Sequence, residues 1–161
     1  FSGWQVARAM SLLEQARVPL VANEVEYSLT NRTAEHDLLA AAQALGFGLL
    51  PWSPLGRGVL TGKYRNGIPA DSRGASDSFA WIIERYLDTR CLAIIEAVAK
   101  AADGLGWSMT EVALAWVRDR PGVTAPIVGA RTAKQLLGAL GVEELTLPPE
   151  IAAALDDVSE E

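Results

Sequence analysis

The sequence contains one cysteine, Cys91, and one histidine, His36, in 161 residues. A single cysteine excludes an internal disulfide framework and a cysteine-based zinc site, and it indicates a reducing compartment, so we expect a cytoplasmic protein. No run of about 18 apolar residues occurs, so we expect no membrane-spanning helix. Basic residues are outnumbered 14 to 20 by acidic ones, and with a net charge of −6 we expect no nucleic-acid partner. A local basic patch for a phosphate-bearing ligand is compatible with that balance.

Half of the residues are apolar and 21% are charged. This is the composition of a globular domain with a core, and it excludes a disordered chain. The N-terminus has neither an initiator Met nor a signal-peptide pattern. Ser2 and Gln5 instead have the spacing of a capping box, which starts a helix. We interpret residues 1–161 as a piece of a longer fold.

Helix-start signals and apolar periodicity predict helices over 2–16, 33–44, 88–102 and 108–118, and further helices beginning at 132 and 149. Short apolar runs predict strands over 19–22, 48–50 and 123–128. Strands without polar alternation, separated by amphipathic helices, favour a parallel sheet covered by helices. A (β/α) barrel and a doubly wound sheet both satisfy this pattern. Three strands cannot close a barrel, which again indicates a missing half.

Four segments lie at the carboxyl ends of predicted strands, where ligands bind in parallel α/β folds: residues 23–27, 52–58, the loop onward to residue 73, and 129–132. Two of them, 52–58 and 129–132, have features that suit a ligand. In the first, Pro51 and Pro54 hold Trp52 at a strand end, where its ring can face a flat ligand or simply cap the core. The backbone amides of 55–58 are expected to be available to a diphosphate. In the second, residues 129–132 lead into a helix N-terminus, which is either an anion site or an ordinary turn.

The run Trp-Ser-Pro-Leu-Gly-Arg-Gly-Val-Leu-Thr-Gly-Lys-Tyr at 52–64 resembles a motif of the aldo-keto reductase family. Segments 26–32, 71–73, 113–116 and 127–131 match the same family in order. The resemblance covers essentially the whole chain. It is strongest to the bacterial reductases related to potassium-channel beta subunits.

The resemblance implies a (β/α)8 TIM barrel, of which residues 1–161 are the C-terminal half with strands six to eight of a single domain. It implies an NADPH-dependent oxidoreductase that reduces the carbonyl of a small aldehyde or ketone by hydride transfer. The N-terminal half of the same barrel is then the expected partner, and the oligomeric state is open. An NADPH-binding regulatory module with little turnover, like the channel subunits, is the alternative. Another barrel enzyme with a phosphate site is a third interpretation, against which Trp52 argues.

The family's cofactor residues can be carried over to matching positions. Trp52 corresponds to the aromatic residue that stacks on the nicotinamide, and Gln135 to a polar residue beside the adenosine. The resemblance also implies a diphosphate loop at Ser53, Pro54, Leu55, Gly56 and Arg57, and phosphate contacts at Lys63, Arg73, Gly129 and Arg131. NADPH is expected over NADH, because the position of Arg131 corresponds to the turn that holds the 2′-phosphate.

The sequence departs from the family at several positions. Glu24 stands where a Gln usually hydrogen-bonds the nicotinamide carboxamide, and an ionised carboxylate can only accept hydrogen bonds. Gly138 and Ala139 replace a Glu-Asn pair that reads the adenine. The family's catalytic Asp, Tyr, Lys and His belong to its N-terminal half, and no matching motif occurs here. We therefore assign no catalytic or metal-binding residue and expect the chain alone to be inactive.

The remaining reactive side chains receive structural interpretations. We expect His36 to be solvated and Cys91 to be a small buried residue. The acidic pairs at 143–144 and 156–157 are expected to be solvated helix ends. The three tyrosines are not equivalents of the family's catalytic acid, and Phe79 and Trp81 suggest an apolar wall for a substrate.

Overall fold

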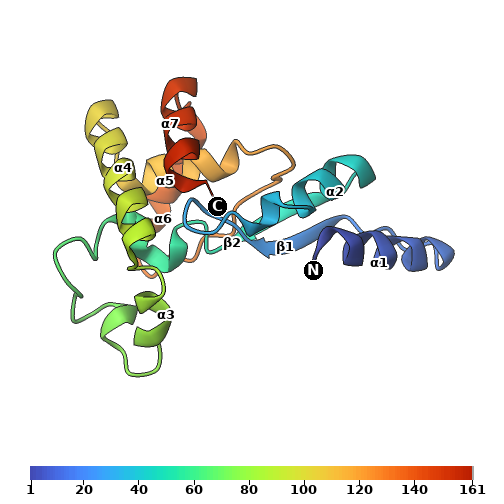
Figure 1. Ribbon diagram of the computed structural model, residues 1–161, viewed down its shortest axis with the longest axis horizontal. Coiled ribbons are helices and arrows are strands. Elements are labelled where there is room, and N and C mark those ends of the chain that lie inside the picture. Colours follow the sequence, from blue (N-terminus) through green and yellow to red (C-terminus); the bar gives the residue numbers. More distant parts are fainter. Residues whose placement is uncertain (161) are drawn as a thin grey trace.

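A computed structural model describes residues 1–160 of the chain. This part contains two strands, β1 (Ala22–Glu26) and β2 (Gly48–Trp52), and seven α-helices (Figure 1). The helices are α1 (Gly3–Gln15), α2 (Leu38–Leu45), α3 (Ala80–Glu84), α4 (Thr89–Leu105), α5 (Met109–Arg118), α6 (Ala133–Leu140) and α7 (Pro149–Ser159). Short 3-10 helices lie at Thr33–Glu35, Gly56–Thr61, Arg73–Ala75 and Gly141–Glu144.

The strands are parallel, as the sequence predicts. β1 pairs with β2 so that Glu26 lies opposite Trp52. On the other side of β2, the backbone over 123–127 runs parallel to it: Thr124 N donates to Leu49 O at 2.8 Å and Ile127 N donates to Pro51 O at 2.7 Å. This third segment makes isolated bridges rather than the continuous strand predicted over 123–128. Pro126 interrupts the ladder there because it has no N–H to donate.

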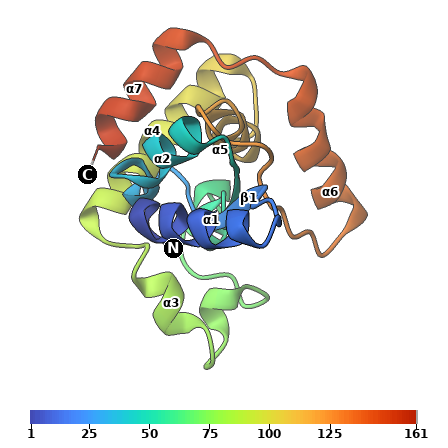
Figure 2. The ribbon, with the colours of Figure 1, turned by 90° about the vertical axis from the view of Figure 1, so that its right-hand side faces the viewer.

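Alternation along β2 separates two faces of the sheet. Leu49 and Pro51 are buried, whereas Leu50 and Trp52 on the opposite face are only half-buried. The buried face packs on the helices, where Tyr27, Ile94 and Trp116 are among the largest side chains of the core. Figure 2 shows the helices placed around the short strands. The opposite face and its strand ends are therefore left accessible to a ligand.

Capping chemistry places three helices where the sequence predicts them. Ser2 N donates to Gln5 Oε1 at 2.9 Å at the start of α1. Asp88 Oδ1 accepts from Cys91 N at 2.7 Å at the start of α4. Ser108 forms the predicted reciprocal capping box at the start of α5. Satisfying the free amides of the first turn is what stabilises these starts.

Two predictions about the elements are wrong, and one helix was not predicted. The first strand covers Ala22–Glu26 instead of 19–22, because these later residues continue in register with β2. The helix predicted over 33–44 is divided, with α2 beginning only at Leu38. Asp37 causes the break: its carboxylate accepts from Gly3 N at 2.8 Å, which fixes it at φ −148°, outside the helical region. Helix α3 has no strong start signal and was not predicted.

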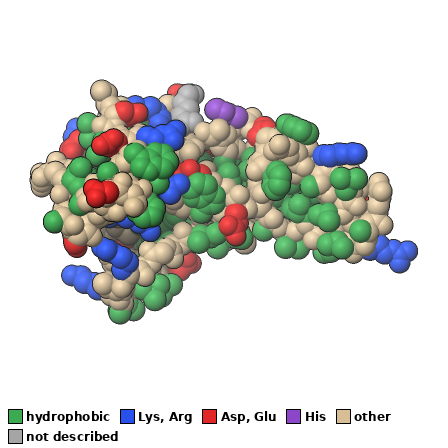
Figure 3. Space-filling view, turned by 90° about the horizontal axis from the view of Figure 1, so that it is seen from below, with side chains coloured by type: hydrophobic (Ala, Val, Ile, Leu, Met, Phe, Trp, Pro, Cys, Tyr) green, Lys and Arg blue, Asp and Glu red, His purple; other side chains and the backbone are tan. Residues whose placement is uncertain are grey.

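Large apolar side chains are exposed at the α1 end of the molecule. Trp4 is 70% exposed, Leu12 50% and Val21 73%, and hydrophobic side chains gather over this end in Figure 3. An apolar surface of this kind normally contacts another protein surface. Within residues 1–160, no helix combines the length and the apolar character needed to cross a membrane.

Candidate functional site

A groove of about 720 Å³ runs past the end of β2 and the start of α6. The loop after β2 forms one side, and residues 127–139 form the other. Ten of the twelve residues assigned to the cofactor lie in its lining: Trp52, Ser53, Pro54, Leu55, Arg57, Lys63, Arg73, Gly129, Arg131 and Gln135. The parallel sheet thus brings together two segments that are far apart in the sequence.

Trp52 lies where β2 ends, with hydrogen-bonded backbone on both sides. Tyr27 N donates to Trp52 O at 3.4 Å, and Ile127 forms a parallel bridge with Trp52. The indole is half-buried and lines the groove, so it is not simply a cap on the core. The guanidinium carbon of Arg57 lies 5.2 Å from the ring centroid. A ring held in this way can stack on a flat ligand in the groove.

The loop after β2 turns through a series of residues with positive φ. These angles are 53° at Ser53, 53° at Gly56, 55° at Arg57 and 99° at Gly58. A Cβ added at Gly58 would lie 2.9 Å from Lys63 Nζ, so this ammonium group lies directly against the loop. The tight path therefore depends on glycine and places cationic groups beside the groove.

The same turn uses some of its own amides. Gly56 N donates to Ser53 O and Gly58 N donates to Leu55 O, both at 2.9 Å. The expectation that all amides over 55–58 are available to a diphosphate is therefore wrong for these two glycines. Their hydrogen bonds stabilise the turn instead of binding a ligand.

The opposite wall is built around the turn into α6. Gln135 N donates to Thr132 Oγ1 at 3.2 Å, which caps the helix as predicted. The Gln135 side chain, however, accepts from Arg131 N at 2.8 Å instead of from Thr132 N. The Arg131 guanidinium donates to Asp71 O at 3.2 Å. Arg131 thus links the turn to the long loop after β2, and its charge is held at the groove.

The charge of the groove is opposite in sign to that of the chain. Five cationic side chains line it, and among residues 1–160 no Asp or Glu belongs to its lining. The five are Arg57, Lys63, Arg73, Arg131 and Lys134. A concave site with charges of one sign concentrates an oppositely charged ligand. The groove therefore suits an anion with several phosphate groups.

Lys134 and the start of α5 also line the groove and were not predicted from the sequence. Lys134 lies in the first turn of α6, where a cation opposes the helix dipole. That unfavourable placement is a signal that could have identified it. Ser108 and Thr110 also line the groove. Ser108 was noted only as a cap, and nothing in its spacing indicates a second role.

Two assigned residues lie outside the groove lining. Glu24 is exposed in the middle of β1, opposite Leu50. Gly56 is buried under the loop, and a Cβ there would lie 2.6 Å from Thr30 Oγ1. Gly56 therefore contributes to the site through the backbone, by allowing the loop to approach Thr30 closely.

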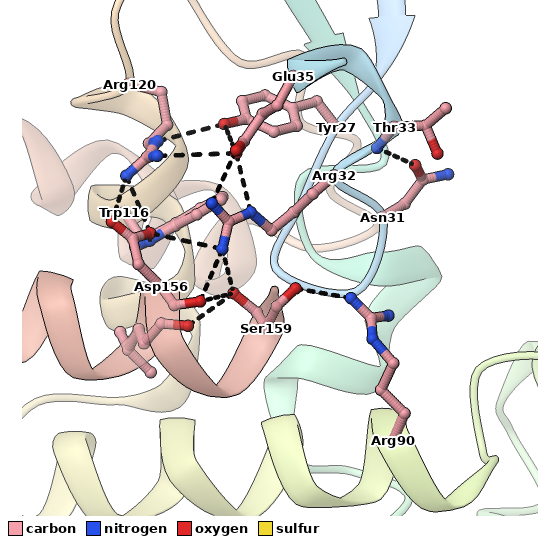
Figure 4. A network of polar contacts seen from close by, with 11 residues as sticks. Tyr27, Asn31, Arg32, Thr33, Glu35, Arg90, Trp116, Arg120, Asp156 and Ser159 are labelled. Carbon is pink, nitrogen blue, oxygen red and sulfur yellow. Dashed lines mark hydrogen bonds and ion pairs between the residues drawn. The ribbon is translucent and has the colours of Figure 1, made fainter. Parts of the chain in front are cut away.

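A polar network behind the sheet joins the segment after β1 to α5 and α7 (Figure 4). Arg32 donates to both carboxylate oxygens of Glu35, at 2.9 and 2.7 Å. Arg120 donates to both carboxylate oxygens of Asp156 at 2.9 Å. Tyr27 connects the two pairs: it donates to Glu35 at 2.5 Å and accepts from Arg120 at 3.2 Å. These are charge-assisted bonds, which are stronger than neutral ones.

The network shows that the interpretation of Asp156 as a solvated helix end is wrong. Its carboxylate also accepts from Trp116 Nε1 at 2.9 Å, so it anchors α7 to the core. Burial by itself would raise the pKa of Glu35, but hydrogen bonds from Arg32 and Tyr27 outweigh it and hold that pKa below its ordinary value. Burial, together with the bond to Glu35, raises the pKa of Tyr27. Both groups thus keep their neutral-pH protonation states.

The other reactive side chains lie outside the groove. Tyr64 Oη accepts from Gly74 N at 3.3 Å, and Tyr86 Oη donates to Glu26 at 2.5 Å. His36 is exposed and Cys91 is buried, both as expected. Among residues 1–160 no group of three or more metal-ligating side chains occurs.

The chain is similar in sequence to several known proteins. Residues 1–160 match the aldo/keto reductase family. The chain belongs to that family. It is 36% identical over 159 residues to an uncharacterized oxidoreductase, YrpG, of Bacillus subtilis, covering 98% of this chain and 46% of that protein. It is 36% identical over 160 residues to a probable voltage-gated potassium channel subunit beta of Oryza sativa subsp. japonica, covering 96% and 47%.

A third relative is an L-glyceraldehyde 3-phosphate reductase of Escherichia coli O157:H7. The identity is 32% over 160 residues, covering 97% of this chain and 46% of that protein. The chain thus spans about half the length of the curated relatives that it matches. The family implies a (β/α)8 barrel, and the parallel strands covered by helices are consistent with a part of one.

Proposed function

We propose that this chain is the cofactor-binding, C-terminal half of an NADPH-dependent aldo-keto reductase that reduces a small aldehyde or ketone. The observation that carries the proposal is the groove itself. An aromatic ring stands at its strand end, and five cationic side chains line it without a carboxylate. This combination suits a ligand that has a flat ring and several phosphates, which NADPH has.

The residues of the groove fit the parts of NADPH. Trp52 would stack on the nicotinamide, the loop beginning at Ser53 would follow the diphosphate, and Arg131 would hold the 2′-phosphate. Lys63 and Arg73 would place positive charge beside the phosphate groups. The bound cofactor supplies the hydride that reduces the carbonyl carbon. This chain's own residues bind and orient it.

The proton for the carbonyl oxygen must come from the other half of the barrel. Tyr27, Tyr64 and Tyr86 are each hydrogen-bonded outside the groove. We therefore propose that the N-terminal half supplies the acid and that the 161-residue chain alone has no reductase activity. The same barrel half is the partner proposed for the exposed apolar surface near Trp4. We also propose a cytoplasmic location, which the scarcity of cysteine supports.

A regulatory module is the second candidate function. Similarity to the rice potassium channel subunit supports it, as does Glu24, whose carboxylate cannot donate to the nicotinamide carboxamide oxygen. Such a module would bind NADPH with little turnover. Reductase activity in a protein that contains both barrel halves would exclude it.

The test of the cofactor site is a fluorescence titration with NADPH. Five tryptophans are present, all within residues 1–160, and among these described residues only Trp52 of the five lines the groove, so NADPH should quench mainly its emission. We expect Trp52→Phe to lose most of the quenching and Trp52→Ala to weaken binding several-fold. The control is Trp4→Phe, whose ring is 70% exposed on α1. Quenching that survives Trp52→Phe would contradict the proposed site.

A further inference from the structure

Arg57 lies between the aromatic ring of the groove and a second cavity of about 330 Å³. Its side chain lines both spaces, whereas Trp52 lines the groove and not the cavity. The guanidinium carbon of Arg57 lies 5.2 Å from the centroid of the Trp52 ring, within the range of a cation–π contact. Arg57 therefore covers the face of the indole that is turned toward the cavity, and the other face is left for a flat ligand in the groove.

The charge of Arg57 is compensated within the protein. Its Nε lies 3.6 Å from Glu26 Oε1, and the two side chains are only 28% and 20% exposed. Among residues 1–160, none of the other four cationic side chains of the groove has a carboxylate within 4 Å. A compensated guanidinium attracts a phosphate less than a free one. This difference favours a role for Arg57 beside the ring over a role beside a phosphate.

Glu26 ends β1 and is held from two directions. The register of the sheet places it opposite Trp52 at the end of β2. The oxygen that faces Arg57 also accepts from Tyr86 Oη at 2.5 Å, and Tyr86 comes from the segment between α3 and α4. Burial and this hydrogen bond raise the pKa of Tyr86, so the phenol keeps the proton that it donates. Hydrogen bonds to a carboxylate are charge-assisted, and this one fixes the direction of the Glu26 side chain.

The contacts of Tyr86, Glu26, Arg57 and Trp52 form one continuous series. An arginine side chain has several rotatable bonds and loses conformational entropy when it is held in one place. The ion pair with Glu26 offsets that loss and keeps the guanidinium against the indole. Neither Glu26 nor Tyr86 lines the groove. Both can therefore act on a ligand in the groove only through Arg57 and the ring.

We infer that Glu26 and Tyr86 are positioning residues of the proposed cofactor site: they hold Arg57 against one face of Trp52, so that the ring presents its other face to the nicotinamide. The inference rests on the proposed function, because the orientation of the ring matters only if the groove binds the cofactor. A binding group is most effective when its own side chain is fixed by packing and by further hydrogen bonds. Tyr86 and Glu26 supply that support from outside the groove.

The test compares two ligands by isothermal titration calorimetry on the full-length protein. One is NADPH, and the other is adenosine 2′,5′-bisphosphate, which has the adenosine and the 2′-phosphate of NADPH but no nicotinamide. Glu26→Gln keeps the shape of the side chain and removes its charge, and Tyr86→Phe removes only the hydroxyl. We expect each variant to weaken NADPH binding roughly two- to tenfold, the range of a stacking contact, and to leave the affinity for the bisphosphate unchanged.

Two controls separate positioning from a general loss of structure. Glu96→Gln removes another carboxylate that is paired with an arginine, at an exposed position outside the groove, and should change neither affinity. In a Trp52→Ala background there is no ring to position, so Glu26→Gln should cause no further loss of NADPH affinity. If circular dichroism shows that Glu26→Gln does not fold, Tyr86→Phe decides by the same comparison of the two ligands.

Each outcome bears on one or both proposals. Equal losses for the two ligands, or a loss from Glu26→Gln that persists in the Trp52→Ala background, would overturn the inference. Unchanged NADPH affinity in Glu26→Gln and Tyr86→Phe, with weaker binding in Trp52→Ala, would overturn it and leave the proposed function intact. Failure of the unmodified protein to bind NADPH, or an affinity that Trp52→Ala leaves unchanged, would overturn the proposed site and the inference with it.

Discussion

The guanidinium of Arg57 lies over the ring of Trp52, 5.2 Å from its centroid. Arg57 adopts this position with φ at 55°, which is unfavourable for a residue with a Cβ. Its Nε also lies 3.6 Å from Glu26. The loop thus holds a strained arginine between the end of β1 and the aromatic ring of the groove. Strain of this kind is commonly found at functional sites.

The first prediction concerns the Arg57–Glu26 pair. Both side chains are partly shielded from solvent, so their coupling should exceed that of a surface pair. A double-mutant cycle with Arg57→Ala and Glu26→Gln should give about 0.5–1.5 kcal/mol of coupling in the free energy of unfolding. Urea denaturation measures it. The exposed pair Arg65–Glu96 is the control, and a coupling no larger than its value would show that Arg57 is not held by Glu26.

The second prediction concerns cofactor preference. Arg131→Ala should weaken NADPH binding by about tenfold to a hundredfold, or ~1–3 kcal/mol, because it removes a charged donor from the 2′-phosphate. NADH has no phosphate there, so its affinity should change little. Fluorescence titration with both cofactors measures this. Arg65→Ala, outside the groove, controls for net charge, and equal losses for NADPH and NADH would refute the assignment of Arg131.

Local signals in the sequence were sufficient to predict the parallel sheet, the loop after Pro51 and the turn at 129–132, whereas the remaining residues of the groove were implied by the family resemblance. The prolines around Trp52 and the cap at Thr132 fix the backbone only within a few residues of their own positions. The long-range contacts were not predictable in the same way. Asp37 ends one helix early because it binds Gly3, and Asp156 is an anchor because Arg120 and Trp116 reach it from α5 and its C-terminal end. Such partners are far apart in the sequence, and only the fold brings them together.

The third prediction concerns the stability of the network around Glu35. Because its pKa is lowered on folding, Glu35 stabilises the fold above the pKa of an unfolded Glu, and this contribution disappears as the pH falls through the folded-state pKa. Glu35→Gln should lower the free energy of unfolding at pH 7 by about 2 kcal/mol. The difference from the unmodified chain should shrink below about pH 4.

Urea denaturation at pH 7, 5, 4 and 3 checks the prediction for Glu35. The control is Glu96→Gln, which removes a similar two-point contact with Arg65 at an exposed position. That variant should have little effect on stability at any of these pH values. A pH-independent loss in Glu35→Gln would mean that the substitution acts through packing and not through charge.

The last prediction concerns Gly56 and distinguishes the effect of its left-handed backbone from the effect of its close contact with Thr30. Gly46 and Gly56 both have left-handed φ, 75° and 53°. A Cβ at Gly46 meets nothing within 4 Å, whereas one at Gly56 would lie 2.6 Å from Thr30 Oγ1 and 3.0 Å from Val59. Gly46→Ala should therefore lower the free energy of unfolding by about 1 kcal/mol, which is the cost of a left-handed backbone for a residue with a Cβ. Gly56→Ala should cost about 2–4 kcal/mol because it adds a steric clash.

The functional readout of these two variants is NADPH affinity. In Gly56→Ala the loop must move away from Thr30, which displaces Trp52 and Arg57 from the wall of the groove, so NADPH should bind more weakly. Gly46→Ala lies at the end of α2, outside the groove, and should bind NADPH like the unmodified chain. If Gly56→Ala loses stability but keeps its NADPH affinity, then the position of the loop does not determine cofactor binding. The proposed role of Gly56 would then be wrong even though its structural role stands.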